Sequence, residues 1–382
     1  MFLSNASLVY RIRFQEMMMK KTLATTAMAV TAAFLMTAHV EAEEVRVYNW
    51  SDYIDVDLLK KFEEETGIKV VYDVFDSNEV LETKILAGKT GYDVVVPTGS
   101  FLSRQIAAGA FMKLDKSKLP NLANEWQDIT KQTAIYDPGN AYSINYMWGT
   151  TGVGYNVAKV AEVMGPDFEP NSLATVFDPK NMEKLASCGV YFLDASDEII
   201  PASLRYIGED PNTNDPAVIA KAEAVLSAVR PYISKFHSSE FINALANGDI
   251  CVAFGWSGDI LQARDRAAEA NNGVEVNYAI PKEGALMWFD QMAVPADAPN
   301  PEAAHKFINF MLDANNAAAA SNYIYYANGN KASQEFLNED VIGDKAIYPD
   351  EETVKKLYIK ESYDPKVQRV VTRMWNKIKT GN

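Results

Sequence analysis

Short β-rich runs alternate with helical segments at the start of the chain, and this alternation constrains the fold more than any other feature. Runs rich in valine, isoleucine and tyrosine occupy residues 45–49, 68–75 and 92–96, and helical segments are predicted over 55–65 and 80–87. A β-α-β-α-β order is connected by right-handed crossovers and builds a parallel sheet. The sequence therefore predicts an α/β fold.

The alternation continues along the rest of the chain. Further strands are predicted at 143–147, 152–155, 190–193, 250–254, 274–280 and 292–294, and further helices at 217–229, 240–246, 260–270, 301–313 and 365–379. Small residues near 148–151 and the stretch 271–273 predict that the chain crosses between two lobes. The predicted division is 43–147 plus 271–317 for lobe 1 and 148–270 plus 318–382 for lobe 2, with the linkers acting as a hinge.

The first 42 residues are predicted to be a targeting signal rather than part of the fold. A pair of lysines precedes an apolar run over 22–38, and residues 40–42 suit a signal peptidase, so we expect cleavage after Ala42. The run is too short and too rich in alanine and threonine for a membrane span, so the mature protein is expected to be soluble in the periplasm. Residues 1–16 indicate a start codon placed too early.

The balance of charges and the scarcity of histidine exclude several functions. The chain has 36 basic and 51 acidic residues and a net charge of −15, which argues against a nucleic-acid partner. Only His237 and His305 follow the signal peptide, and no HExxH or CxxC motif is present, so we expect no metal, no cofactor and no catalytic residue. A carboxylate pair such as Glu198 and Asp259 keeps a secreted hydrolase as an alternative.

Aromatic, hydroxyl and carboxylate side chains gather around the predicted strands, where open α/β sheets bind their ligands. They lie in WSDY (50–53), PTGS (97–100), DASDE (194–198), WSGD (256–259) and WFD (288–290), and none of these segments holds a lysine or arginine. An ammonium group over an indole face gains about 0.5–2 kcal/mol, and a carboxylate neutralises its charge. The segments therefore suit a cationic ligand with an apolar middle. Each of these residues could instead have a purely structural role, as a core aromatic, an N-cap or a carboxylate in the first turn of a helix, and this alternative stays open.

Two cysteines, Cys188 and Cys251, follow the predicted signal peptide. In an oxidising compartment such a pair is expected to be bonded, and closing a loop of this length stabilises a protein by about 4 kcal/mol. Two buried thiols remain the alternative. Neither cysteine follows the cleavage site, so the acylated terminus of a lipoprotein is not expected.

Eight segments of the mature chain resemble a known family. They are YNWSDYI (48–54), TGIKVVYDVFDSNEVLETKILAG (66–88), YDVVVP (92–97), MWGTTGVGYN (147–156), SCGV (187–190), FHSSEFINALANGDICVAFGWSGD (236–259), IPKEGA (280–285) and YYANGNKA (325–332). The sequence resembles the polyamine-binding periplasmic receptors of ABC importers, the putrescine/spermidine family. This resemblance implies a two-lobed venus-flytrap fold of type II, each lobe a mostly parallel sheet flanked by helices. It also implies a monomer that closes around a polyamine and delivers it to membrane permease subunits, without enzymatic activity.

The resemblance also assigns roles to individual residues of this chain. It implies aromatic walls from Trp50, Trp256 and Trp288, supporting contacts from Tyr53 and Tyr326, polar positions at Ser51, Thr98 and Ser100, carboxylates for ammonium groups at Glu198, Asp259 and Asp290, an acidic neighbour at Asp52, and a disulfide between Cys188 and Cys251.

Two positions depart from the family's pattern and bear on the choice of ligand. Trp288 stands where putrescine-preferring members tend to carry phenylalanine, and Thr98 replaces a usual serine. Putrescine is the expected ligand, with spermidine next. A receptor for another cationic or amino-acid-like solute is the alternative, but an amino acid needs an arginine for its carboxylate, and Arg46 and Arg104 are not placed for that role.

Overall fold

Strand β4 (Ser143–Asn156) passes through the centre of the sheet and joins two groups of strands. The computed structural model describes residues 43–381, and the described residues from Glu44 onward form one compact unit. The predicted signal peptide lies outside the described residues. Up to Thr150, β4 pairs with β9 (Met287–Ala293), and from Thr151 onward it pairs with β7 (Val252–Trp256). The chain therefore changes strand partners within a single continuous strand.

The first group of strands contains the N-terminus of the described chain. Strand β1 (Glu44–Trp50) lies between β2 (Lys69–Phe75) and β3 (Val94–Val95), and both pairings are parallel. Strand β9 then joins β3 to β4, antiparallel to both, and β10 (Ala327–Asn328) pairs antiparallel with β4.

The second group of strands lies on the other side of β4. Strand β7 is antiparallel to β4 and parallel to β5 (Val190–Phe192), which is parallel to β6 (Lys235–Phe236). Strand β8 (Val276–Ala279) pairs antiparallel with the last residues of β4. The sheet is thus mixed: its outer strands are parallel, as predicted for a βαβ chain, and the central strands that carry the chain across are antiparallel.

Helices fill the intervals between these strands. Before β4 lie α2 (Val56–Thr66), α3 (Asn78–Ala87), α4 (Gly99–Ala107) and α5 (Gln127–Thr133). Between β4 and β8 lie α6 (Val157–Met164), α7 (Ala174–Phe177), α8 (Pro179–Leu185), α9 (Ser196–Tyr206), α10 (Pro216–Val229), α11 (Glu240–Ala246) and α12 (Ser257–Ala270). After β9 lie α13 (Pro301–Met311), α14 (Ala314–Ile324), α15 (Glu339–Ile342), α16 (Glu351–Val354) and α17 (Pro365–Thr380). Over residues 43–381, no helix is both long and apolar enough to cross a membrane.

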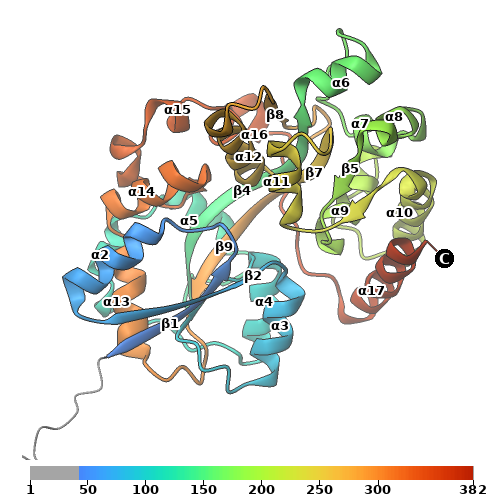
Figure 1. Cartoon of the computed structure of the whole chain (residues 1–382). Helices are drawn as coiled ribbons and strands as arrows, with labels where there is room; N and C mark the ends of the chain where they lie inside the picture. The colour runs from blue at the N-terminus through green and yellow to red at the C-terminus, as the bar shows by residue number, and fades with distance from the viewer. Residues whose placement is uncertain (1–42, 382) are drawn as a thin grey trace, which may run out of the picture. The chain divides into compact units, whose positions relative to one another are not determined.

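Two large hydrophobic cores underlie the two groups of strands, so the fold has two lobes. One core packs Val47, Val94 and Phe62 against helix α13, while the other surrounds Phe192 and Phe254 between helices α7 and α10. Figure 1 shows β4 and β9 running between the two groups. The residue limits given above for the lobes stay a prediction.

The predicted elements agree with the structure except near the crossing. The segments 143–147 and 152–155, predicted as two strands, are one strand, because the glycines between them remain in extended, paired backbone. Strand β9 begins at Met287, not at 292, so Trp288 and Asp290 lie within it rather than before it. The disulfide between Cys188 and Cys251 is confirmed, with 2.06 Å between the sulfur atoms.

Candidate ligand-binding site

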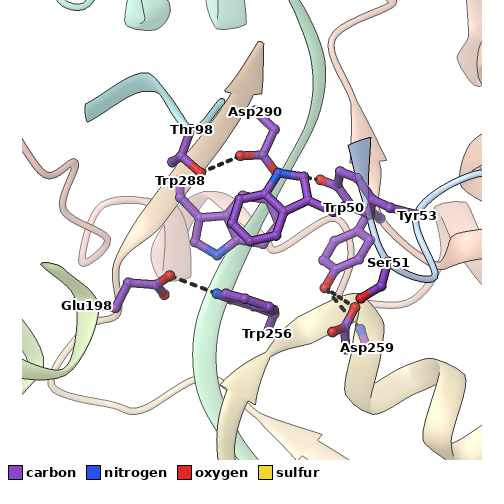
Figure 2. Close-up of a pocket in the computed structure, with 10 residues that line it drawn as sticks. Trp50, Ser51, Tyr53, Thr98, Glu198, Trp256, Asp259, Trp288 and Asp290 are labelled. Atoms are coloured by element: carbon purple, nitrogen blue, oxygen red, sulfur yellow. Dashed lines mark hydrogen bonds between the residues drawn. The ribbon is translucent and has the colours of Figure 1, made fainter. Parts of the chain in front are cut away.

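One pocket collects most of the side chains that the sequence singled out. It is lined by Trp50, Ser51, Tyr53, Thr98, Glu198, Trp256, Asp259, Trp288, Asp290 and Tyr326 (Figure 2). These residues come from the ends of β1 and β7, from the first turns of α9 and α12, from the N-cap of α4, and from β9 and the segment after α14. The pocket therefore draws on both lobes.

Two of the predicted site residues do not line this pocket. Asp52 has a positive φ of 54°, and its carboxylate forms an ion pair with Arg266 at 2.7 Å. Ser100 is buried in the first turn of α4, where its carbonyl oxygen accepts a hydrogen bond from the hydroxyl of Ser362. Gln262 also donates to the carbonyl oxygen of Asp52 at 3.2 Å. Both the main chain and the side chain of Asp52 therefore contact helix α12.

Two of the three tryptophans of the pocket are held by hydrogen bonds. The indole N–H of Trp50 donates to the carbonyl oxygen of Val96 at 2.9 Å, and that of Trp256 donates to Oε1 of Glu198 at 2.8 Å. The Trp50 and Trp256 rings meet edge to face, with centroids 5.4 Å apart. The third indole, of Trp288, lies 5.3 Å from the Tyr326 ring, and its buried N–H has no hydrogen-bond partner among residues 43–381.

Asp290 is the carboxylate of strand β9 that faces the pocket. The hydroxyl of Thr98 donates to Oδ1 at 2.6 Å, and the hydroxyl of Tyr53 donates to Oδ2 at 2.8 Å. Burial raises the pKa of Asp290 to about 7, although both hydrogen bonds stabilise the charged form and lower it. The two hydroxyls therefore orient the carboxylate without neutralising it.

Asp259 lies in the first turn of α12. The hydroxyl of Tyr326 accepts a hydrogen bond from the Asp259 amide at 3.0 Å and donates to Oδ1 of the same residue at 2.7 Å. Burial raises the pKa of Asp259 to about 7, and Tyr326 opposes that shift. A carboxylate in a first helical turn also interacts favourably with the helix dipole.

Glu198 lies in the first turn of α9, whose Ile199 and Ile200 pack in the same core as Ile260 of α12. It accepts hydrogen bonds from the indole of Trp256 and from the hydroxyl of Thr151. Burial raises the pKa of Glu198 to about 8, and the neighbouring charge of Asp197 adds to the shift. The sequence reasoning missed Thr151, because a hydroxyl inside a strand does not by itself indicate a function.

The pocket is acidic, aromatic and without a counter-charge of its own. Three buried carboxyls line it, and none of its lining residues in the described part of the chain is a lysine or arginine. Among residues 43–381, no group of three or more histidine, cysteine or carboxylate residues has the arrangement of a metal site. Buried carboxylates without positive partners are costly, so the pocket is built to receive positive charge from a ligand.

Comparison with known proteins identifies the family. Residues 57–349 match the family of bacterial extracellular solute-binding proteins. The chain belongs to this family. Its members bind solutes and are not enzymes, so a secreted hydrolase is no longer an alternative.

Curated relatives of this solute-binding protein match over nearly their whole length. The putrescine-binding periplasmic protein SpuD of Pseudomonas aeruginosa is 50% identical over 366 residues, which cover 95% of this chain and 100% of that protein. The putrescine-binding periplasmic protein PotF of Escherichia coli is 49% identical over 354 residues, covering 92% of this chain and 96% of that protein.

A solved structure extends the similarity to the fold. The spermidine/putrescine ABC transporter substrate-binding protein PotD of Streptococcus pneumoniae superimposes with a TM-score of 0.72 at 31% identity. The superposition covers 89% of this chain and 99% of that chain. The two-lobed α/β fold predicted from the sequence is confirmed.

Proposed function

We propose that this solute-binding protein captures a polyamine, with putrescine as the expected ligand and spermidine next, and delivers it to an ABC importer. The observation that carries the proposal is the set of three buried carboxyls, Glu198, Asp259 and Asp290, around a pocket walled by indoles. A linear diamine has a positive charge at each end and methylenes between, which matches carboxylates at separate places and flat aromatic walls. Relatives at 50% and 49% identity are named for putrescine binding, which supports the same ligand here.

Binding is proposed to close the two lobes without any chemical step. Glu198 lies on helix α9, whose Ile199 and Ile200 pack in one core, while Trp50 and Asp290 come from strands of the other, and Trp256 packs against both. A dication that contacts carboxylates from both lobes binds the closed form more tightly, so it shifts the population toward closure. The hinge is proposed to lie between lobe 1 (43–147 plus 271–317) and lobe 2 (148–270 plus 318–382).

The location and partners follow from the proposed transport role. We propose cleavage of a signal peptide after Ala42, release of a soluble monomer into the periplasm, and docking of the closed form on membrane permease subunits. Relatives described as periplasmic support that location.

A receptor for an amino-acid-like solute is the second candidate, and the arginines do not favour it. Arg104 forms an ion pair with Glu82 and lines a different cavity, while Arg46 pairs with Glu44. No guanidinium is therefore available in the pocket for a ligand carboxylate.

A calorimetric panel tests the proposal. Putrescine, cadaverine, spermidine and spermine are titrated into the purified protein, with glutamate and glycine betaine as controls. We expect a stoichiometric complex with putrescine, unchanged ligand, and no binding of glutamate. Asp259→Ala is expected to weaken putrescine binding by about tenfold or more, because one charge-assisted contact is lost, whereas the same change at exposed Asp249 leaves affinity unaltered. Binding of glutamate in place of every polyamine would overturn the proposal.

A further inference from the structure

Gly149 and Trp288 stand directly opposite each other on strands β4 and β9. Opposed residues of an antiparallel pair project from the same face of the sheet, so a side chain at 149 would compete for the space of the indole. Both residues are buried, and Trp288 has an exposed fraction of 5%. The indole therefore occupies room that the missing side chain leaves open.

The fit between this glycine and the ring is tight. A Cβ atom placed on Gly149 would lie 2.7 Å from Cζ2 and 2.9 Å from Cη2 of Trp288, and 3.0 Å from the hydroxyl oxygen of Ser257. Carbon atoms at rest are separated by about 3.5–4.0 Å, so the ring has to move if any side chain is present. The atoms that would collide are the outer atoms of the indole, which a phenylalanine ring lacks.

The position of the Trp288 indole depends on packing rather than on a hydrogen bond. Within the described part of the chain its indole N–H has no hydrogen-bond partner, whereas the N–H groups of Trp50 and Trp256 donate to the Val96 carbonyl and to Glu198. Figure 2 shows the Trp288 ring among the pocket residues with no dashed line to its nitrogen. Packing within the core of one lobe, including contact with the Tyr326 ring and with the bare backbone at 149, therefore sets the position of this pocket wall.

We propose that Gly149 is the positioning residue of Trp288, and that the absence of its side chain sets the depth of the polyamine pocket. This inference rests on the proposed function for its consequence in binding, but the contact itself is a property of the protein alone. Substitution at 149 displaces the indole into a narrow pocket and thereby weakens binding without changing any residue that touches the ligand.

A double-mutant cycle tests this role. Putrescine affinity is measured by calorimetry for the wild type, Gly149→Ala, Trp288→Phe and the double variant. We expect Gly149→Ala to weaken binding by about tenfold or more when Trp288 is present, because the displaced indole takes up space that the ligand needs. The same change is expected to weaken binding by less than about threefold when residue 288 is phenylalanine, because the colliding atoms are gone. An equal loss of putrescine affinity with tryptophan and with phenylalanine at position 288 would overturn the proposal. It would show that Gly149 is needed by the backbone of β4 rather than by the indole.

Thermal unfolding of the same four ligand-free proteins separates this inference from the proposed function. Gly149→Ala is expected to lower the unfolding midpoint with Trp288 present, and Trp288→Phe to restore most of the loss. Trp50→Phe is the matched control and is expected to restore nothing, because the atoms nearest to a Cβ at 149 belong to Trp288 and Ser257 and not to Trp50. If the wild type binds no polyamine, the proposed function is wrong. The unfolding cycle then still shows whether Gly149 positions Trp288. A double variant whose unfolding midpoint is no higher than that of Gly149→Ala would contradict the inference.

Discussion

The carboxylate of Asp52 forms an ion pair with the guanidinium of Arg266, with 2.7 Å between Oδ1 and Nη2. Asp52 follows strand β1 of one lobe, whereas Arg266 lies on helix α12, whose Ala263 and Ala267 pack in the core of the other. The pair thus bridges the lobes beside the pocket. The side chains are 38% and 35% exposed, so solvent and salt screen the attraction.

Loss of this bridge is expected to weaken ligand binding modestly. Arg266→Gln removes a contact between the lobes, and exposed ion pairs contribute about 0.2–1 kcal/mol, so we expect polyamine affinity to fall by about 1.4- to fivefold at low salt. The effect should shrink as salt rises. Arg264→Gln on the same helix breaks an ion pair with Asp344 that does not involve the pocket, and serves as the control. Equal losses for both variants would show that α12 is merely destabilised.

Polyamine affinity is expected to rise with pH across the neutral range. The pKa is raised by burial to about 7 for Asp259 and Asp290 and to about 8 for Glu198, so the empty pocket holds protons near neutral pH. Ammonium groups favour the ionised carboxylates, and binding therefore releases protons. Each released proton gives about a tenfold gain in affinity per pH unit. Calorimetry in two buffers with different ionisation enthalpies measures the release directly, and an affinity that is flat between about pH 6 and pH 8.5 would contradict it.

Asp259→Asn is expected to stabilise the empty protein while it weakens binding. Because burial raises the pKa of Asp259 above its unfolded value, its favourable contribution to folding is complete below about pH 4 and is lost as the pH rises through about 7. Asparagine keeps an oxygen that accepts from Tyr326 and carries no charge. The unfolding midpoint of the ligand-free variant should therefore exceed that of the wild type at pH 8 and match it near pH 4. Asp249→Asn, at an exposed position, should show neither difference.

The residues that follow strands were accessible to prediction from the sequence, because the carboxyl ends of strands converge at one edge of a sheet. That rule named the segments that hold Trp50, Glu198 and Asp259, and the family resemblance then selected these residues from among their neighbours. Tyr326 follows helix α14 instead, and only the family resemblance pointed to it.

Other features depend on long-range packing that the sequence does not display. The left-handed backbone of Asp52 turns its carboxylate to a residue more than two hundred positions away, and no local pattern encodes such a partner. Thr151 lies inside a strand, where a hydroxyl usually indicates nothing about function, yet it donates to Glu198. The glycines of β4 suggested a break, but the strand continues through them because their backbones pair with β9 and β7.

Removal of the disulfide is expected to reduce stability far more than affinity. The bond joins Cys188 to Cys251, 63 positions apart, and a closed loop of that length stabilises a protein by about 4 kcal/mol through the entropy of the unfolded chain. Neither cysteine lines the pocket, although Cys251 directly precedes strand β7, which ends at Trp256. Urea unfolding of the oxidised and reduced protein measures the difference in the free energy of unfolding. The variant with serine at both cysteine positions should be as stable as the reduced protein, and its stability should not change when reductant is added. Putrescine affinity at low denaturant should change by less than about threefold, since distant sites contribute independently. A large loss of affinity on reduction, with the fold intact, would instead mean that the bond holds β7 and its tryptophan in the binding geometry.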